Sequence, residues 1–157
     1  MHALVRALAV VALTAAPVLT GSARAEPYRP GTVSLGLGLG DPAALDIKFW
    51  NDNVSGFDLG LGLEHFDDVF GVYGEYELGL VSFALGNSGA RGVFYLGVGG
   101  AVAFTNDYTS VAVVIPVGLD FRFDAPVDLF IEARPGIGVV HRPAFGIGGQ
   151  IGVRWRF

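Results

Sequence analysis

Strict alternation of side-chain classes along the C-terminal segment is the feature that most restricts what this chain can fold into. One set of alternate positions carries large apolar residues with a single glycine: Phe145, Ile147, Gly149, Ile151, Val153, Trp155 and Phe157. The positions between them carry Gly146, Gly148, Gln150, Gly152, Arg154 and Arg156. Successive side chains of a β-strand point to opposite faces, whereas a helix repeats about every 3.6 residues. The segment is therefore predicted to be a strand with one apolar and one polar or glycine face.

The same period of two recurs along the chain, and no segment shows a convincing helical period. Eight strands are predicted, at residues 32–39, 43–50, 54–64, 69–84, 91–104, 108–123, 127–140 and 144–157. The breaks between them are short and rich in Asp, Asn, Gly and Pro, so consecutive strands should pair as antiparallel hairpins. The motif Leu-Gly-Leu-Gly-Leu at 35–39 recurs at 59–63, as expected for an up-and-down meander.

The first 25 residues read as a secretory signal peptide. Arg6 precedes an apolar stretch at residues 7–19, and Ala23 and Ala25 form a small-residue cleavage pattern. The stretch is shorter than the roughly 20 residues that a spanning helix needs. We expect cleavage after Ala25, which leaves residues 26–157 as an exported protein without a helical membrane span.

Composition excludes several other classes of protein. Hydrophobic residues make up 52% of the chain and charged residues 16%, which is incompatible with a disordered chain. The absence of cysteine excludes disulfides, thiolate metal sites and a cysteine nucleophile. A net charge of −5 argues against nucleic-acid binding.

Side-chain volume predicts which face of the strands points outward. An eight-stranded barrel has an interior only just wide enough for side chains to fill, and the large apolar residues would overfill it. The glycine and charged positions are therefore expected inside, and the apolar face outside. Two aromatic belts are also predicted, as in barrels that cross membranes. One comprises Phe49, Phe57, Phe83, Phe94, Phe121, Phe123, Trp155 and Phe157, and the other Phe66, Phe70, Phe104, Tyr108 and Phe145.

Together, these features resemble the small eight-stranded outer-membrane barrels of the OmpA- and OmpX-like group. The C-terminal Val153, Trp155 and Phe157 resemble the signal that the barrel-assembly machinery reads in that group. The resemblance implies outer-membrane lipid and this machinery as partners, a monomer, and no cofactor. The short outer loops disfavour the adhesion and receptor roles that some members have.

A network of inward charges is the candidate functional site. Hairpin registers place Arg122 opposite Asp128, Glu132 opposite Arg154, and Asp58 beside Glu75 or Glu77. An arginine reaching across the lumen would then have to balance the clustered acids, with Arg91, Arg134, Arg154 and Arg156 as candidates. The predicted network comprises Asp46, Lys48, Asp58, Glu75, Glu77, Arg91, Asp120, Arg122, Asp128, Glu132, Arg134, Arg154 and Arg156.

Catalytic and metal sites are not predicted. Residues 64–68 place acids and a histidine at one turn, but without the ligand spacing of a calcium loop. His141 falls near Thr109 and Ser110 in the expected register, yet no orienting acid completes a nucleophilic site.

The predicted fold is therefore an all-β, eight-stranded, antiparallel up-and-down transmembrane barrel. Its predicted role is structural, in outer-membrane integrity, with an ion-paired lumen. The alternatives are a narrow channel for ions or small solutes, a lipid-modifying enzyme, and a soluble secreted barrel.

Overall fold

The chain folds into one continuous sheet of antiparallel strands in this computed structural model. The structure describes residues 28–64, 69–86, 90–140 and 143–157. Nine strand segments occur in these ranges: β1 (Val33–Asp41), β2 (Ala43–Trp50), β3 (Ser55–Glu64), β4 (Val69–Ala84), β5 (Arg91–Phe104), β6 (Thr109–Val114), β7 (Val117–Arg122), β8 (Val127–Gly138) and β9 (Phe145–Arg156). Among the described residues there is no helix long and apolar enough to cross a membrane.

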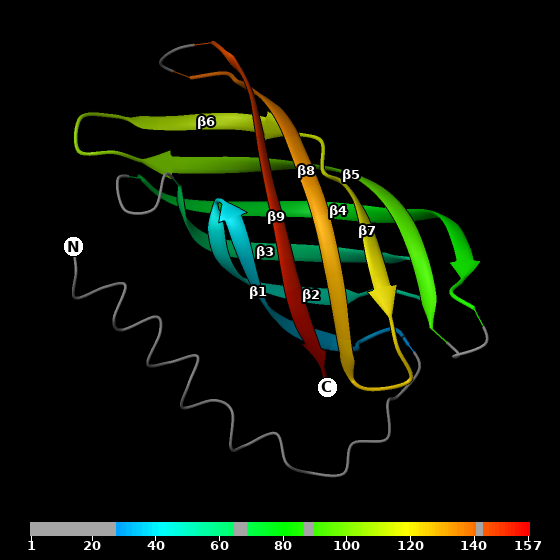
Figure 1. The fold of residues 1–157 in the computed structure, drawn as a ribbon. Helices are drawn as coiled ribbons and strands as arrows, with labels where there is room; N and C mark the ends of the chain where they lie inside the picture. The colour runs from blue at the N-terminus through cyan, green and yellow to red at the C-terminus, as the bar shows by residue number, and fades with distance from the viewer. Residues whose placement is uncertain (1–27, 65–68, 87–89, 141–142) are drawn as a thin grey trace.

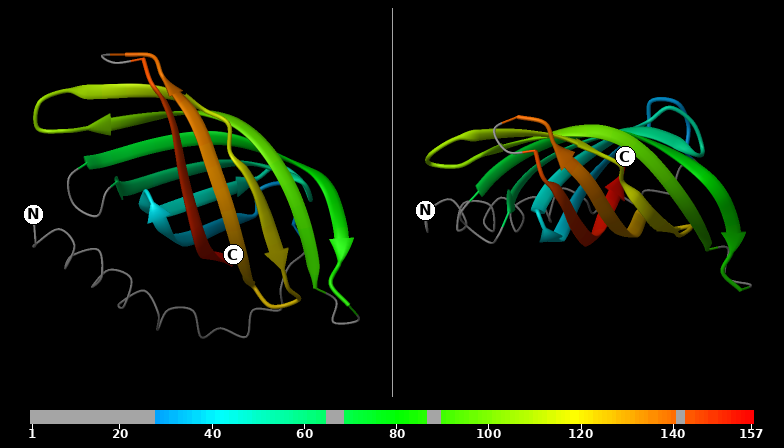
Figure 2. Two further views of the ribbon diagram at one scale, coloured as in Figure 1. Left: turned by 45° about the horizontal axis from the view of Figure 1, so that its top comes forward. Right: turned by 90° about the horizontal axis from the view of Figure 1, so that it is seen from above.

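The sheet closes on itself into a ring of eight strand positions (Figure 1; Figure 2). Strands β1 to β5 pair in sequence order, β6 and β7 each pair with β5 and β8, and β8 pairs with β9. β1 pairs antiparallel with β9 to complete the ring. The predicted eight-stranded antiparallel barrel is confirmed. We call the end of the barrel that holds Tyr28 and Phe157 the terminal end. The opposite end, where the β1–β2 and β5–β6 connections lie, is called the far end.

The sixth predicted strand is interrupted, and this corrects the expectation of a continuous strand at 108–123. Proline has no N–H to donate to a ladder, so Pro116 separates β6 from β7. Two hydrogen bonds bridge the break, from Gly97 N to Pro116 O at 2.8 Å and from Ile115 N to Pro135 O at 2.9 Å. The register against β5 is unchanged across the break, so β6 and β7 together occupy one strand position.

Two of the predicted registers are confirmed, and one is wrong. Arg122 faces Asp128 across β7 and β8, and Asp58 faces Glu75 across β3 and β4. Glu132, however, faces Gln150, and Arg154 faces Asp128 instead. The last residue pair of this hairpin joins Ile137 to Phe145, so the connection is centred before Pro143 and the register is displaced from the predicted one.

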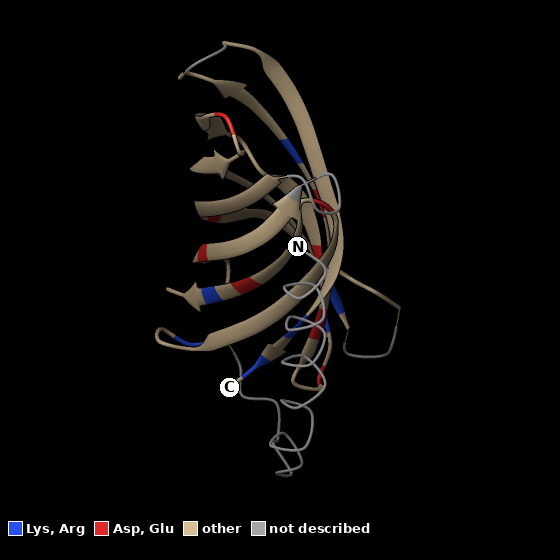
Figure 3. Ribbon diagram, turned by 90° about the vertical axis from the view of Figure 1, so that its left-hand side faces the viewer, with Lys and Arg blue, Asp and Glu red and all other residues tan. Residues whose placement is uncertain are grey.

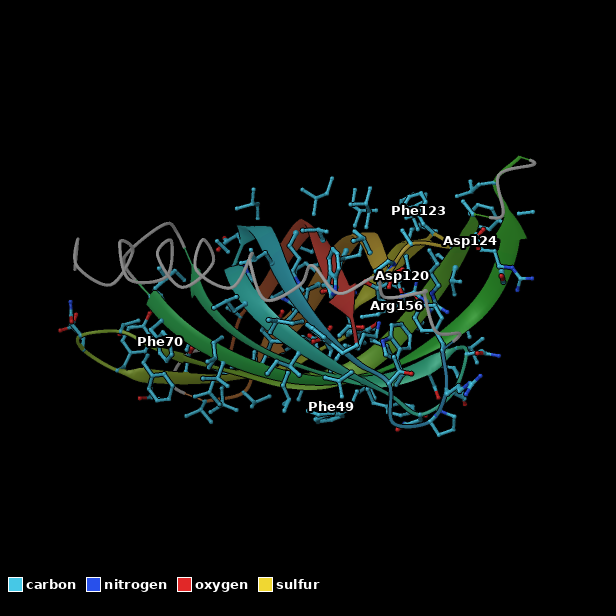
Figure 4. The ribbon with its side chains drawn as sticks, turned by 90° about the horizontal axis from the view of Figure 1, so that it is seen from below. Phe49, Phe70, Asp120, Phe123, Asp124 and Arg156 are labelled. Carbon is cyan, nitrogen blue, oxygen red and sulfur yellow. The ribbon has the colours of Figure 1, made fainter. Side chains whose placement is uncertain are left out.

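Apolar side chains cover the outside of the barrel. The large hydrophobic residues of alternate positions are substantially exposed, for example Leu59 at 42% and Ile131 at 47%. Of the predicted belt at the terminal end, Phe49, Phe57, Phe83, Phe123 and Phe157 are exposed. Of the belt at the far end, Phe70, Phe104, Tyr108 and Phe145 are exposed. Phe94, Phe121 and Trp155 are half-buried, and Phe66 lies outside the described residues. Figure 4 labels Phe49 and Phe70 on the outer surface.

Glycines on the inner face make room for aromatic rings on the neighbouring strand. Gly60 lies opposite Tyr73, Gly118 opposite Tyr95, and a Cβ at either glycine would overlap the opposing ring. A Cβ at Gly152 would overlap the ring of Phe130 in the same way. The lumen glycines therefore lie beneath large side chains, and they do not leave an open channel at these positions.

Gly60→Val is expected to destabilise the barrel by about 1–3 kcal/mol, because the new side chain would compete with the Tyr73 ring for the same space. The matched control is Gly100→Val. Gly100 is exposed on the outer face, and a Cβ there would make only an ordinary contact at 3.6 Å. Urea unfolding of the refolded barrels gives the comparison. The double variant Gly60→Val/Tyr73→Ala should regain part of the loss, and equal stability of the two single variants would contradict the packing argument.

Candidate functional site: the polar lumen

The centre of the lumen is built around Arg154 of β9. Its guanidinium contacts three carboxylates from three different strands: Asp46 at 2.8 Å, Asp58 at 2.5 Å and Asp120 at 3.2 Å. The ring of Phe130 lies under the guanidinium, 3.8 Å from its carbon to the ring centroid. Arg154 is 1% exposed, so these contacts are made away from solvent. One arginine thus ties both sides of the ring together, and Figure 3 shows acidic and basic positions on strands across the barrel.

Lys48 forms a second ionic centre beside the first. Its ammonium pairs with the carboxylate of Glu77 and lies 3.5 Å from that of Asp120. The rings of Trp50 and Tyr95 flank the ammonium at 4.3 and 5.0 Å from their centroids. Aromatic faces attract cations, and the attraction increases when water is excluded.

Arg134 forms a third centre, nearer the far end. Its Nε lies 2.5 Å from Glu75 Oε1, and its Nη2 lies 2.6 Å from Glu132 Oε1. Glu132 also accepts a hydrogen bond of 2.8 Å from the Tyr95 hydroxyl. Carboxylate oxygens of Glu75, Glu77 and Glu132 lie within 4.8 Å of one another, and Arg134, Lys48 and Tyr95 separate and partner them.

Aromatic rings and two arginines close the terminal end. Tyr28 packs edge-on against Trp50, with ring centroids 4.5 Å apart. The guanidinium carbons of Arg122 and Arg156 lie 4.2 and 4.4 Å from the Tyr28 ring. Burial raises the pKa of the Tyr28 phenol well above its ordinary value, so the side chain is neutral. Asp120 and Arg156 both lie inside the barrel (Figure 4), and Arg156 also pairs with Asp128 at 3.2 Å.

The turn between β2 and β3 helps to fix this closure. Asp52 accepts hydrogen bonds of 2.7 Å from the backbone N–H groups of Val54 and Ser55. These donors hold the pKa of the Asp52 carboxyl below its usual value. The turn that they stabilise presents the Asn53 carbonyl, which accepts a hydrogen bond of 2.5 Å from Arg122 Nη1.

Twelve of the thirteen predicted network residues are buried, and Arg91 is the exception. It is exposed at the first position of β5, opposite Ala84. The β4–β5 hairpin continues past the start of β3, which begins at Ser55 opposite Leu78, and on the other side of β5 Arg91 is level with Arg122 at the end of β7. Arg91 is exposed at this edge, and no ion pair of its side chain is found among the described residues. The prediction that Arg91 helps to neutralise the lumen acids is therefore wrong, whereas Arg134, Arg154 and Arg156 each pair with a carboxylate.

Aromatic residues that were not predicted from the sequence complete the site. Trp50, Tyr73, Tyr95 and Phe130 are at most 3% exposed inside the barrel. Each lies an even number of residues from a charged residue of the same strand that was predicted to face the lumen, so strict alternation could have placed these rings inward. Tyr28 precedes β1, and no strand pattern could have indicated its position. His141 and residues 65–68 lie outside the described residues.

The interior holds more acids than bases, so removing a buried cation is expected to cost more stability than removing a buried carboxylate. The buried charged residues comprise seven carboxylates and five cations. Lys48→Gln should cost about 3–5 kcal/mol, since it leaves Glu77 without its cation in a buried site. Glu77→Gln should cost clearly less, because Lys48 retains Asp120 at 3.5 Å. Urea unfolding of the refolded variants measures the difference, and a costlier Glu77→Gln would contradict the charge argument.

The far half of the interior is hollow. A cup of about 460 Å³ opens there, and small and apolar side chains line most of its wall. Arg134 and Tyr73 also line it. The charged centres and the cup therefore divide the lumen into a filled terminal half and an open far half.

These features define a small antiparallel barrel of eight strand positions, with an apolar exterior and an ion-paired interior that is packed in its terminal half. The N-terminal β-barrel domain of OprF from Pseudomonas aeruginosa has the same fold, with a TM-score of 0.57 and 15% sequence identity. The match covers 81% of this chain and 98% of that chain. The predicted resemblance to OmpA-like barrels is confirmed at the level of the fold. No protein-family model matches the chain. No curated protein matches it.

Proposed function

We propose that this protein is an outer-membrane β-barrel with a structural role in membrane integrity. The observation that carries the proposal is the inverted distribution of side chains. Seven buried carboxylates and five buried cations lie inside, while large apolar residues are exposed outside on every strand except β7, whose outward residues are half-buried. An exterior of this kind would be unfavourable in water over so large an area, and it suits a lipid environment. The signal peptide at residues 1–25, the monomeric state and assembly through the C-terminal Val153, Trp155 and Phe157 belong to the same proposal.

Occlusion of the lumen supports a structural role over a channel. Tyr28, Trp50, Arg122 and Arg156 close the terminal end, and the Arg154 centre with Phe130 fills the middle. Such a plug would obstruct the passage of ions. A non-enzymatic role is part of the same proposal.

Fractionation and gel migration test the membrane proposal. The protein should be recovered with the outer membrane, and its migration on a detergent gel should change on heating as the barrel unfolds. Recovery in the soluble periplasm would overturn the proposal and favour a secreted barrel.

Single-channel recording tests the occlusion. The refolded protein in a planar bilayer at high salt should give a flat trace. Reproducible conductance steps by the unmodified protein would favour the channel alternative. Phe130→Ala combined with Tyr28→Ala serves as a positive control, because it removes rings from two levels of the plug.

A further inference from the structure

The cup at the far end has the size and lining of a binding site. Its volume of about 460 Å³ falls within the range of small-molecule pockets, roughly 300–1,000 Å³. Small residues, including Gly71, Ala101, Ala112, Gly136 and Gly138, contribute much of its wall. Their inward positions leave space between the barrel axis and the backbone, so the cup can hold an apolar group.

The polar groups at the floor of the cup are hydrogen-bond donors. Arg134 is 5% exposed, and its Nη1 is buried without a hydrogen-bond partner in the described part of the chain. The Tyr73 hydroxyl accepts a hydrogen bond of 3.3 Å from Gln150, which leaves its own proton available to an acceptor. Ser110 adds a hydroxyl to the wall. An occupant with a hydrogen-bond acceptor would satisfy these donors.

The charge around Arg134 selects a neutral acceptor. Glu75 and Glu132 pair with the guanidinium from behind, and neither of them lines the cup. Their two carboxylates already compensate the positive charge, so an anionic head group would gain little attraction and would lose its hydration. A cationic head group at the floor would face the donor groups of Arg134 and Tyr73, because Asp41, the acid among the lining residues, lies at the end of β1 beside Gly149.

The wall of the barrel is low on one side of the cup. Strand β1 ends at Asp41, which pairs with Gly149, whereas β9 begins earlier at Phe145 and extends past this point. Figure 1 shows the β8–β9 hairpin rising well beyond the tip of the β1–β2 hairpin. A Cβ at Gly146 would meet nothing within 4 Å. We call this opening, between Asp41 and residues 145–148, the notch.

The rim of the notch is strongly apolar. Leu39, Phe145 and Ile147 are 71%, 70% and 69% exposed, the largest exposed fractions among the large hydrophobic residues that the structure describes. They are uncovered because the neighbouring strand ends beside them. A hydrocarbon chain lying over this rim would bury apolar surface while its polar end reached the cup.

From the cup, its donor floor and the apolar notch, we infer a binding site for a neutral amphiphile that carries one hydrogen-bond acceptor, such as an acyl ester. The hydrocarbon lies along Leu39, Phe145 and Ile147, and the acceptor meets Tyr73 and Arg134. The inference rests on the proposed membrane location, since the notch opens sideways toward the surrounding lipid. A membrane lipid and a free ester are two sources of the same chemistry.

Titration of the barrel in lipid nanodiscs tests the site. The protein is labelled at alanine methyl groups, and the shifts of Ala101 and Ala112 are followed during addition of methyl octanoate, octanoate or octylammonium. With concentrations corrected for partition into the disc, methyl octanoate should saturate the shifts and bind about tenfold more tightly than either charged probe, because the charged heads are costly to desolvate. Tighter binding of octylammonium, or no saturable shift with any probe and no lipid contact, would overturn the inference.

Variants separate the cup from the outer surface. Ala112→Phe fills the cup and should abolish the saturable shift of Ala101. Its matched control is Val113→Phe, since Val113 is 49% exposed on the outer face of the same strand, and this variant should retain the shift. Tyr73→Phe keeps the ring and removes the donor, so it should weaken methyl octanoate binding by about 2- to 10-fold, the equivalent of one hydrogen bond. Unchanged binding by Ala112→Phe would contradict the cup as the site.

Magnetisation transfer without added probe distinguishes the two sources. Contacts between the Ala112 methyl and lipid chains would identify membrane lipid as the occupant, and saturable binding of the ester without such contacts would identify a free amphiphile. Insertion into the nanodisc is monitored separately by heat-modifiable migration. A barrel that inserts but binds nothing would defeat this inference alone, whereas a barrel that fails to insert would count against the proposed function.

Discussion

Arg154→Met should be the most damaging single substitution in the lumen, with a loss of about 3–5 kcal/mol or more in the free energy of unfolding. The guanidinium contacts Asp46, Asp58 and Asp120, and all three carboxylates are at most 2% exposed. Removing one partner of a buried ion pair leaves an uncompensated charge, and here the same side chain serves three. Domains have only about 5–15 kcal/mol of stability, so the variant is expected to fold poorly. Urea unfolding with heat-modifiable gel migration as the readout measures the effect.

Arg91→Met is the matched control, because Arg91 carries the same side chain but is exposed at the end of the β4–β5 hairpin. It should leave stability nearly unchanged. If Arg154→Met does not fold at all, the triple variant Arg154→Met/Asp46→Asn/Asp58→Asn keeps the argument testable. It removes the cation together with two of its carboxylates, while Asp120 retains Arg122 at 3.2 Å and Lys48 at 3.5 Å. Recovery of folding by the triple variant is expected, and equal stability of the two single variants would contradict the role of Arg154.

Ile131→Arg should strongly impair insertion into lipid vesicles. Ile131 is 47% exposed on the outer face of β8, where it pairs with Leu119 and Ile151 in the middle of the apolar band. An arginine at the bilayer midplane of a barrel costs about 2–4 kcal/mol, whereas one near the interface costs about 0–1 kcal/mol. Ile137→Arg is the matched control, since Ile137 is 56% exposed on the same strand near the far end. The unfolding free energies of the two variants, measured from vesicles, should differ accordingly.

This comparison also distinguishes a membrane barrel from a soluble one. In water, replacing an exposed isoleucine by arginine removes apolar surface and carries no depth dependence. Equal effects of the two substitutions, or greater stability of Ile131→Arg, would therefore contradict the membrane location. A penalty that is larger for Ile131→Arg would support it independently of fractionation.

The sequence predicted the ring, its strand order and most of the inner face, because these depend on a period that is visible along the chain. Leu35 and Leu59 belong to the repeated motif, and both pair with Ile47 of the intervening strand β2. The interruption at Pro116 was also encoded, since a proline within a strand pattern weakens the ladder at that point. The prediction of a continuous strand at 108–123 underestimated the effect of this proline.

Partners within the lumen could be predicted only where a short turn defined the register. Arg122 opposite Asp128 follows from the tight connection at residues 123–126, whereas the longer connection before β9 misplaced Arg154 relative to Glu132. Contacts across the lumen were beyond sequence reasoning altogether. Arg154 reaches Asp46, Asp58 and Asp120 because the ring brings β2, β3 and β7 around one axis, and no spacing in the chain records that distance.

Local sequence patterns were sufficient to predict two-faced strands, a strand number that closes a small barrel, and the placement of charge and glycine on one face. These properties are local, because alternation and turn chemistry act over a few residues. Which charges meet depends on the closed ring. The same is true of the packing of Tyr28, Trp50, Tyr95 and Phe130 inside the barrel, and of the exposure of Arg91. The notch also depends on the ring, because it forms where β1 ends before β9 at their shared edge. Closure of the ring creates these contacts, and their energies depend on distances across the barrel that the order of residues does not specify.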